Sequence, residues 1–167
     1  MVADIDIDIR VRRFQPQDAG AIAQLFHDTV RTINRQHYSQ PQVEAWDPEN
    51  IHFRDWVAVC SGRYTAIAEV DGEIAGFGEL EANGHIDCFY CHQDYQGQGV
   101  GRRLYQALED EAKVLGLSRL FVEASITAHP FFERMGFAML KEQQVLHRGQ
   151  AFVNYIMEKN LRYPTVD

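Results

Sequence analysis

Cysteine, proline and long apolar runs are all scarce in this chain. Its 167 residues include 3 cysteines and 5 prolines. Cys60, Cys88 and Cys91 are too few and too unevenly spaced for a disulfide framework, so we expect free thiols. No apolar stretch approaches the roughly 18 residues of a membrane-spanning helix. Residues 1–8 also lack the basic start and apolar run of a signal peptide. These absences predict a protein without a membrane partner that works in the cytoplasm.

Positive charge is also in short supply. The 24 Asp and Glu residues outnumber the 16 Lys and Arg residues, giving a formal net charge of −8. Because nucleic-acid binding depends on clustered Lys and Arg facing phosphates, we expect no nucleic-acid partner. A negative potential instead attracts cations such as ammonium ions. With 46% hydrophobic residues, no repeats and no low-complexity tract, the chain predicts a single domain over residues 1–167.

The first third of the chain predicts one strand followed by helices. Residues 5–14 alternate apolar and charged side chains, which is typical of a half-buried strand. Apolar residues then recur at helical spacing over residues 18–34. Residues 42–46 and 51–59 predict short helical pieces interrupted by prolines.

The middle of the chain predicts a three-stranded antiparallel meander. Residues 64–70, 73–81 and 85–91 are each strand-like. Asp71-Gly72 and Asn83-Gly84 separate them, and both dipeptides favour the type I′ turns that join antiparallel strands.

The rest of the chain alternates helices and strands. Residues 99–115 carry one apolar stripe opposite charged side chains, as an amphipathic helix does. A short strand at 120–123, a short helix at 127–135 and two strands at 137–147 and 151–159 follow. The expected order β-α-α-β-β-β-α-β-α-β-β is that of an α/β protein with helices packed on a mixed sheet.

A glycine-rich turn joins the meander to the amphipathic helix. Gly97, Gly99 and Gly101 lie where the strand ends and the helix begins. Glycines let a ligand approach the backbone, and a first helical turn presents unpaired N–H groups, so this order of elements favours a phosphate-binding site. A P-loop would need Lys and then Ser or Thr where Arg102 and Arg103 stand. The dinucleotide fingerprint needs another glycine spacing and a parallel βαβ unit.

Two segments resemble motifs of the GCN5-related N-acetyltransferase (GNAT) family. Residues 96–101, Gln-Gly-Gln-Gly-Val-Gly, are similar to the family's Gln/Arg-x-x-Gly-x-Gly/Ala motif. Residues 128–137, Ala-His-Pro-Phe-Phe-Glu-Arg-Met-Gly-Phe, resemble its Ala-x-x-Phe-Tyr-x-x-x-Gly-Phe segment. The resemblance covers almost the whole chain, in the family's order of elements. It implies the family's fold and acetyl-CoA as the cosubstrate.

The resemblance also implies which residues contact acetyl-CoA. Backbone amides from residues 96–102 would hold the pyrophosphate, and residues 89–91 would pair with the pantetheine arm. The two central strands would splay apart, often with a bulge, and open a cleft for cosubstrate and acceptor. The implied cosubstrate-binding residues are Phe89, Tyr90, Cys91, Gln96, Gly97, Gln98, Gly99, Val100, Gly101, Arg102, Ser125, Phe131 and Phe132.

Catalysis requires a base, because an amine with a pKa of about 10.4 is protonated at pH 7 and cannot attack a thioester. By the resemblance, His85 and Asp87 align with strand positions that carry a catalytic His or Glu in some family members; alternatively, both are solvated residues beginning a strand. Phe132 departs from the family, since many members have a Tyr there that protonates the CoA thiolate. That role then falls to Tyr90, to Tyr155 or to water. The candidate catalytic residues are therefore His85, Asp87 and Tyr90.

A zinc site is an alternative use of His85, Cys88, Cys91 and His92. Cys88 and Cys91 are an odd number of residues apart, however, so on a regular strand they point to opposite faces. No second ligand pair lies nearby in the sequence. We therefore expect no metal and two buried strand cysteines.

The acceptor pocket has the weakest sequence signal. In the family, the stretch between the first two helices and the second strand walls this pocket. That stretch contains His37, Tyr38, Trp46, Asp47 and Glu49, aromatic and acidic residues that can cage a cation. The alternative is that these aromatic residues simply join the core.

These observations predict an acetyl-CoA-dependent N-acetyltransferase that acts on a primary amine of a small molecule or a protein terminus. The alternative is a non-catalytic acyl-CoA-binding sensor, which Phe132 suggests because it has no proton to give. A homodimer is compatible with the sequence, which does not name the acceptor.

Overall fold

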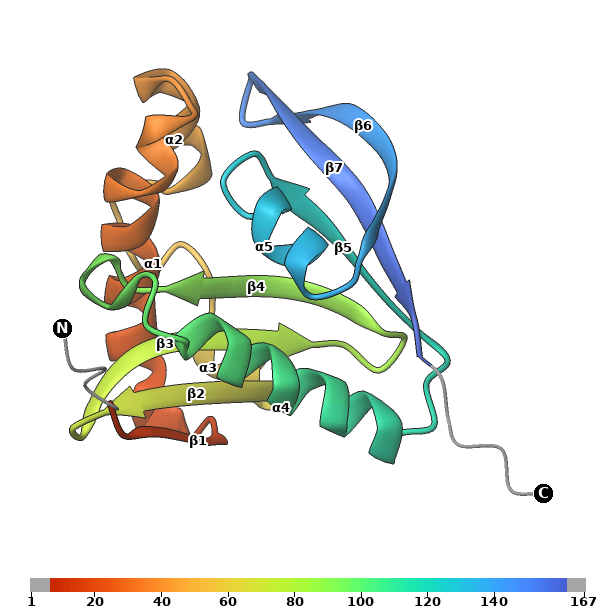
Figure 1. Cartoon of the computed structure of the whole chain (residues 1–167). Helices are drawn as coiled ribbons and strands as arrows, with labels where there is room; N and C mark the ends of the chain where they lie inside the picture. Colours follow the sequence, from red (N-terminus) through yellow and green to blue (C-terminus); the bar gives the residue numbers. More distant parts are fainter. Residues whose placement is uncertain (1–6, 162–167) are drawn as a thin grey trace, which may run out of the picture.

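The computed structural model describes residues 7–161 and shows one seven-stranded mixed sheet with helices on both faces (Figure 1). The strand order is β1-β2-β3-β4-β5-β7-β6. Every neighbouring pair is antiparallel except β4 and β5, which are parallel. The strands are β1 (Ile9–Arg13), β2 (Tyr64–Val70), β3 (Glu73–Leu80), β4 (His85–Cys91), β5 (Arg119–Ser125), β6 (Ala138–His147) and β7 (Gln150–Asn160).

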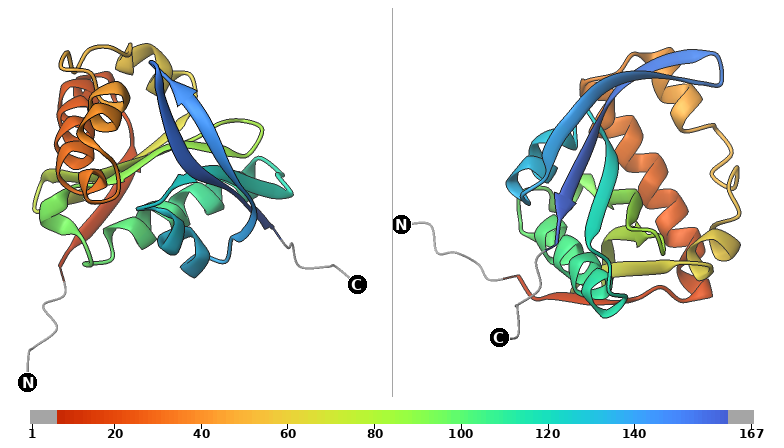
Figure 2. Two further views of the ribbon diagram at one scale, coloured as in Figure 1. Left: turned by 90° about the horizontal axis from the view of Figure 1, so that it is seen from above. Right: turned by 90° about the vertical axis from the view of Figure 1, so that its right-hand side faces the viewer.

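The helices divide between the two faces of the sheet, as the view from above shows (Figure 2, left). One core packs α1, α2 and α3 against the sheet, and the other packs α4 and α5 against the opposite face. None of the helices in the described part of the chain is long and apolar enough to cross a membrane. The helices are α1 (Ala19–Thr32), α2 (Gln40–Trp46), α3 (Trp56–Ser61), α4 (Val100–Val114) and α5 (His129–Arg134).

The predicted fold class is confirmed, but three helices rather than the two of the predicted order precede β2, and boundaries in the first third are shifted. The predicted strand 5–14 includes residues 5 and 6, which lie outside the described residues, and β1 begins at Ile9. Pro41 lies in the first turn of α2, where the missing N–H costs nothing, rather than interrupting the helix. The next helix begins at Trp56 rather than at residue 51, because the Asp55 side chain caps it by accepting the Ala58 N–H at 3.1 Å.

The parallel strands β4 and β5 pair only briefly. Their register joins His85 to Phe121 and Ile86 to Val122, and beyond these pairs the strands diverge (Figure 1). The diverging ends lie beside the glycine turn that precedes α4. The separation of the central strands that the family resemblance implies is therefore present.

The bulge implied by the resemblance is present between β3 and β4. Gly78 pairs with Phe89 and Leu80 pairs with Ile86, so Glu79 alone stands opposite Asp87 and Cys88. Because of this extra residue, side chains at 87 and 88 both turn toward the face covered by α1, α2 and α3.

Candidate active site

A cavity of about 440 Å³ lies where β4 and β5 diverge. The glycine turn, the ends of both strands and α5 form its walls. All the residues predicted to contact the cosubstrate line this cavity except Gln98, whose side-chain amide instead donates to the Asp94 carbonyl at 3.2 Å.

The glycine turn has the geometry that phosphate oxygens need. Gly97 and Gly99 have φ of +73° and +89°, a left-handed conformation that residues with a Cβ rarely adopt. A Cβ at Gly101 would lie 3.1 Å from the Phe131 ring. The first backbone hydrogen bond of α4 runs from the Arg103 N–H to the Gly99 carbonyl at 3.1 Å, which leaves the amides of residues 100–102 without an intrahelical partner. This segment therefore fits a pyrophosphate.

A second cavity, of about 490 Å³, lies on the face of the sheet covered by α1, α2 and α3. Aromatic side chains dominate its wall. The two cavities share lining residues at the point where β4 and β5 part, so they meet there; these shared residues are Trp46, Asp87, Tyr90, Glu123 and Ser125.

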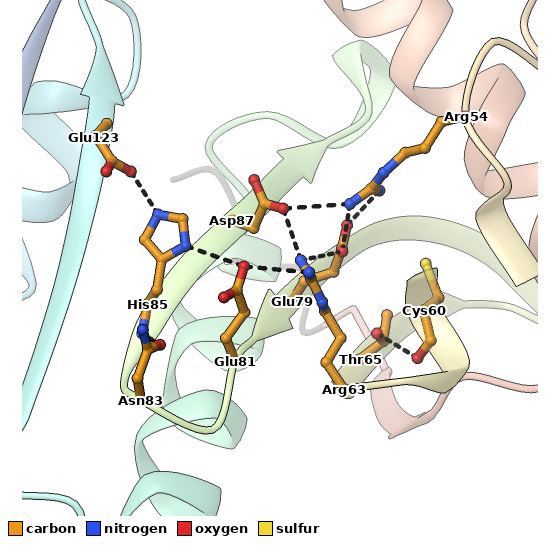
Figure 3. Close-up of polar contacts among 10 residues, drawn as sticks. All are labelled: Arg54, Cys60, Arg63, Thr65, Glu79, Glu81, Asn83, His85, Asp87 and Glu123. Carbon is orange, nitrogen blue, oxygen red and sulfur yellow. Dashed lines mark hydrogen bonds and ion pairs between the residues drawn. The ribbon is translucent and has the colours of Figure 1, made fainter. Parts of the chain in front are cut away.

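Two arginines hold the carboxylate of Asp87 at this junction (Figure 3). The fully buried Glu79 accepts two hydrogen bonds from Arg54, both of 2.8 Å, and one from Arg63 of 3.2 Å. Asp87 Oδ2 accepts from Arg63 at 2.6 Å and from Arg54 at 3.3 Å. The Asp87 side chain is 40% exposed, and among residues 7–161 no partner is recorded for Oδ1. One carboxylate oxygen thus remains available to a ligand.

His85 lies between two carboxylates and lines neither cavity (Figure 3). Its Nδ1 is 3.2 Å from Glu81 and its Nε2 is 2.5 Å from Glu123. Burial alone would lower the pKa of His85, but the hydrogen bonds to Glu123 and Glu81 outweigh it and raise this pKa above its ordinary value of 6.5. When protonated, His85 donates to both carboxylates and has no lone pair to offer an amine.

Glu123 is the residue of the junction that the sequence interpretation missed. Its side chain is 43% exposed and lines both cavities. The sequence feature that could have pointed to Glu123 is an acidic residue near the end of a short apolar strand. Its place opposite β4, however, depends on the parallel register of the two strands, which the sequence does not reveal.

Of the two tyrosines considered for the acid role, only Tyr90 lies where the cavities meet. It lines both cavities, and its ring packs 4.9 Å from the Phe26 ring and 5.8 Å from the Phe77 ring. Burial, above all, raises its pKa well above the ordinary 10, so the phenol keeps its proton. Tyr155, the other candidate, lines neither cavity, and its ring instead packs 4.5 Å from that of His129.

The two strand cysteines lie on opposite faces of the sheet, as predicted. Cys91 packs with the core under α4, and Cys88 packs with the core under α1. Burial raises the pKa of Cys91 to about 11 and that of Cys88 well above 9, so both thiols are protonated at neutral pH. Within residues 7–161, no three His, Cys, Asp or Glu side chains are grouped so that they could hold a metal ion.

The candidate cation-caging stretch divides between cavity and core. Tyr38 and Trp46 line the second cavity. Asp47 is fully buried against an arginine and a histidine of α1, 2.7 Å from each. His37 hydrogen-bonds to a threonine after β5 at 2.9 Å, and Glu49 is exposed. Only the two aromatic residues of the predicted set thus reach the cavity.

Comparison with known proteins identifies relatives of the chain. The acetyltransferase (GNAT) domain model matches residues 34–159. The chain is 33% identical over 151 residues to the uncharacterized N-acetyltransferase YafP of Escherichia coli (strain K12), covering 90% of this chain and 95% of that protein. It is also 30% identical over 149 residues to the amino-acid acetyltransferase of Serratia proteamaculans (strain 568), but spans only 31% of that protein.

Solved structures share the fold. A GCN5-related N-acetyltransferase from Rhodopseudomonas palustris superposes with a TM-score of 0.86 at 33% identity, covering 93% of this chain and 98% of that one. The PaiA N-acetyltransferase of Thermoplasma acidophilum, solved with coenzyme A, gives a TM-score of 0.78 at 17% identity, covering 93% of this chain and 100% of that one. The latter likeness concerns the fold alone.

A sheet that opens between two parallel strands beside a glycine turn, with a cavity at the opening, is the arrangement that the resemblance to an acetyltransferase family implies. The chain belongs to the GNAT family, and it is an N-acetyltransferase that uses acetyl-CoA. The family and the cosubstrate implied by the sequence resemblance are thus confirmed.

Proposed function

We propose that the two cavities are the cosubstrate side and the acceptor side of one active site, which acetylates a primary amine where they meet. The observation that carries this proposal is that Asp87, Tyr90 and Glu123 line both cavities. Amides of residues 96–102 bind the pyrophosphate, and the ends of β4 and β5 receive the thioester. The acceptor then enters from the second cavity.

The side chains at the junction move the two protons of the reaction. Acetyl transfer joins the amine nitrogen to the thioester carbonyl carbon and breaks the carbon–sulfur bond. Asp87 and Glu123 accept the proton that the ammonium loses, directly or through water. Tyr90 donates a proton to the departing sulfur, the role for which Phe132 has no hydroxyl. Tyr90 is then reprotonated, directly or through water, by the second proton that the amine nitrogen loses after the attack. His85 acts through Glu123, whose carboxylate it holds, and is a positioning residue in this scheme.

Carboxyl-to-amide substitutions test this assignment. In Asp87→Asn and Glu123→Gln, we expect acetyl-CoA affinity measured by calorimetry to change less than about 3-fold. We expect kcat to fall roughly 10²-fold or more in at least one variant, the size of a lost general base. Asp110→Asn, an exposed acid on α4, is the matched control. Unchanged kcat in both junction variants would remove these residues from the mechanism.

The same assay separates the enzyme from a sensor. A sensor binds acetyl-CoA but releases no CoA with any amine, whereas the enzyme releases CoA in proportion to the acetylated product. A panel of small amines and a peptide with a free amino terminus also separates the two acceptor classes.

We further propose the cytoplasm as the compartment and a homodimer as the assembly. Three free thiols support a reducing compartment. The edge strand β6 supports an association between copies, since Met139, Leu140 and Leu146 are 50%, 53% and 81% exposed on it. Sedimentation of the wild type beside Leu140→Lys tests the dimer, which the charge should disrupt.

A further inference from the structure

The wall of the second cavity is built from aromatic rings. They come from α2 and the segment before it, from α3 and the segment before it, and from β4 and β7. Several pack edge to face; the Tyr38 and Trp46 ring centroids, for example, are 5.2 Å apart at 90°. Such a wall presents flat apolar surfaces to a ligand that enters it. The rings that line the cavity include Tyr38, Trp46, Phe53, Trp56, Tyr90 and Phe152.

Charge in this cavity favours a cation at one end. Asp87 and Glu123 line it at the junction, and Arg54 supplies the one guanidinium among its lining residues. Arg63, which lies outside the lining, also donates to Asp87 Oδ2. Within residues 7–161, Asp87 Oδ1 and Glu123 Oε1 have no recorded partner. The remaining titratable groups in the lining are uncharged at pH 7. Burial raises the pKa of Tyr38, Cys88 and Tyr90, and burial together with Arg148 lowers that of His147. An ammonium ion therefore finds carboxylate oxygens at the junction.

The same cavity has no cation ready for a carboxylate on the ligand. Both terminal nitrogens of Arg54 already donate to the buried Glu79, and one also donates to Asp87. Arg148 lies over the Phe53 ring, donates to the Ala45 carbonyl and does not line the cavity. A carboxylate carried into this aromatic pocket would lose its water without gaining a bidentate partner.

We infer that the acceptor is a primary amine on an apolar, ring-sized body that carries no carboxylate, of the arylalkylamine class. The ammonium lies between Asp87 and Glu123 and the ring lies among the aromatic side chains. This inference rests on the proposed function, since it names the acceptor for that site.

Three amines test this acceptor class, because two of them differ from phenethylamine by one feature each. Phenethylamine has the amine and the ring, phenylalanine adds a carboxylate, and butylamine lacks the ring. From CoA release, we expect kcat/KM for phenethylamine to exceed that for phenylalanine at least about 100-fold and that for butylamine at least about 10-fold. Phenylalanine or glutamate used as well as phenethylamine would overturn the inference.

A matched pair of variants assigns the preference to the cavity wall. Phe53→Leu removes a ring from the lining, whereas Phe14→Leu removes a ring that packs in the same core but lines neither cavity. We expect Phe53→Leu to weaken phenethylamine binding to the CoA-bound protein about 5- to 10-fold in calorimetry, and Phe14→Leu to leave this binding within about 2-fold. Equal effects of Phe53→Leu and Phe14→Leu on phenethylamine binding would contradict the inference.

Further outcomes separate the inference from the proposed function. Efficient acetylation of a polyamine or a peptide amino terminus, with no use of phenethylamine, would overturn the inference and leave the proposed function standing. Binding of phenethylamine beside CoA without CoA release from acetyl-CoA would support the site and overturn the enzymatic function. If phenethylamine is neither bound nor acetylated, the inference is overturned.

Discussion

The cosubstrate cavity and the acceptor cavity are built in different ways. One continuous stretch, the end of β4 with the glycine turn and the start of α4, supplies the phosphate-binding wall of the first, largely through backbone amides. The second gathers side chains from α1 to β7, segments that are distant in the sequence. A site made of backbone depends on local conformation, whereas a site made of side chains depends on how the whole chain folds.

This difference means that opposite kinds of substitution damage the two cavities. Added bulk at a glycine harms the first, where a side chain would occupy the ligand's place. Removal of a functional group harms the second, where each side chain has a specific role.

Gly101→Glu should have the largest effect. Its side chain would project beside the Phe131 ring into the cosubstrate cavity and bring a negative charge near the phosphates. We expect acetyl-CoA affinity to fall at least about 100-fold by calorimetry while the circular dichroism spectrum stays native. Gly20→Glu adds the same side chain to an exposed helix position with nothing within 4 Å, and it should bind normally. Equal affinity in both variants would mean that the pyrophosphate binds elsewhere.

Glu79→Gln should destabilise the acceptor side. It removes the fully buried negative charge between Arg54 and Arg63, and breaking a buried ion pair costs about 3 kcal/mol of the free energy of unfolding. Urea denaturation measures this loss. Glu142→Gln, at an exposed position on β6, should stay within about 0.5 kcal/mol of the wild type. A similarly small change in Glu79→Gln would show that Asp87 is held without this ion pair.

Tyr90→Phe should slow the reaction without weakening cosubstrate binding. If this phenol protonates the departing sulfur, its loss should lower kcat roughly 10- to 100-fold. Tyr155→Phe is the control, since Tyr155 lines neither cavity. Phe132→Tyr should bring no gain in rate, and its hydroxyl would cost about 1–3 kcal/mol of stability if left unpaired in this buried position. A faster Phe132→Tyr enzyme would show that no side chain of the wild type protonates the departing sulfur.

His85 should titrate above its ordinary pKa of 6.5, and this is the smallest of the expected effects. The hydrogen bonds to Glu123 and Glu81 overcome the effect of burial on its pKa, so Glu123→Gln should lower it. Because the folded-state pKa is the higher one, the stability from His85 is fully present below about pH 6.5 and is lost as pH rises through the folded-state value. NMR chemical shifts of the His85 imidazole across a pH series measure this pKa in the wild type and in Glu123→Gln. A His85 pKa below 6.5 in the wild type would contradict the contacts described here.

The sequence predicts features that depend on local conformation. The Asp-Gly and Asn-Gly turns, the glycine turn and the amphipathic α4 were each predicted from short stretches, and they position the cosubstrate cavity. The side-chain network at the junction was not predicted. Glu123 meets His85 only because β4 and β5 pair in parallel, and Arg54 meets Glu79 across 25 positions of the chain. Asp87 and Cys88 share a face only because the strand bulges there.

A crystal structure with CoA and an amine that the enzyme acetylates would test most directly whether the two cavities form one active site. If they do, pyrophosphate oxygens should lie about 3 Å from backbone N–H groups of residues 97–102, and an amine nitrogen should lie within about 3.2 Å of the Asp87 or Glu123 carboxylate. An amine bound outside the second cavity, or a pyrophosphate away from the glycine turn, would contradict this arrangement.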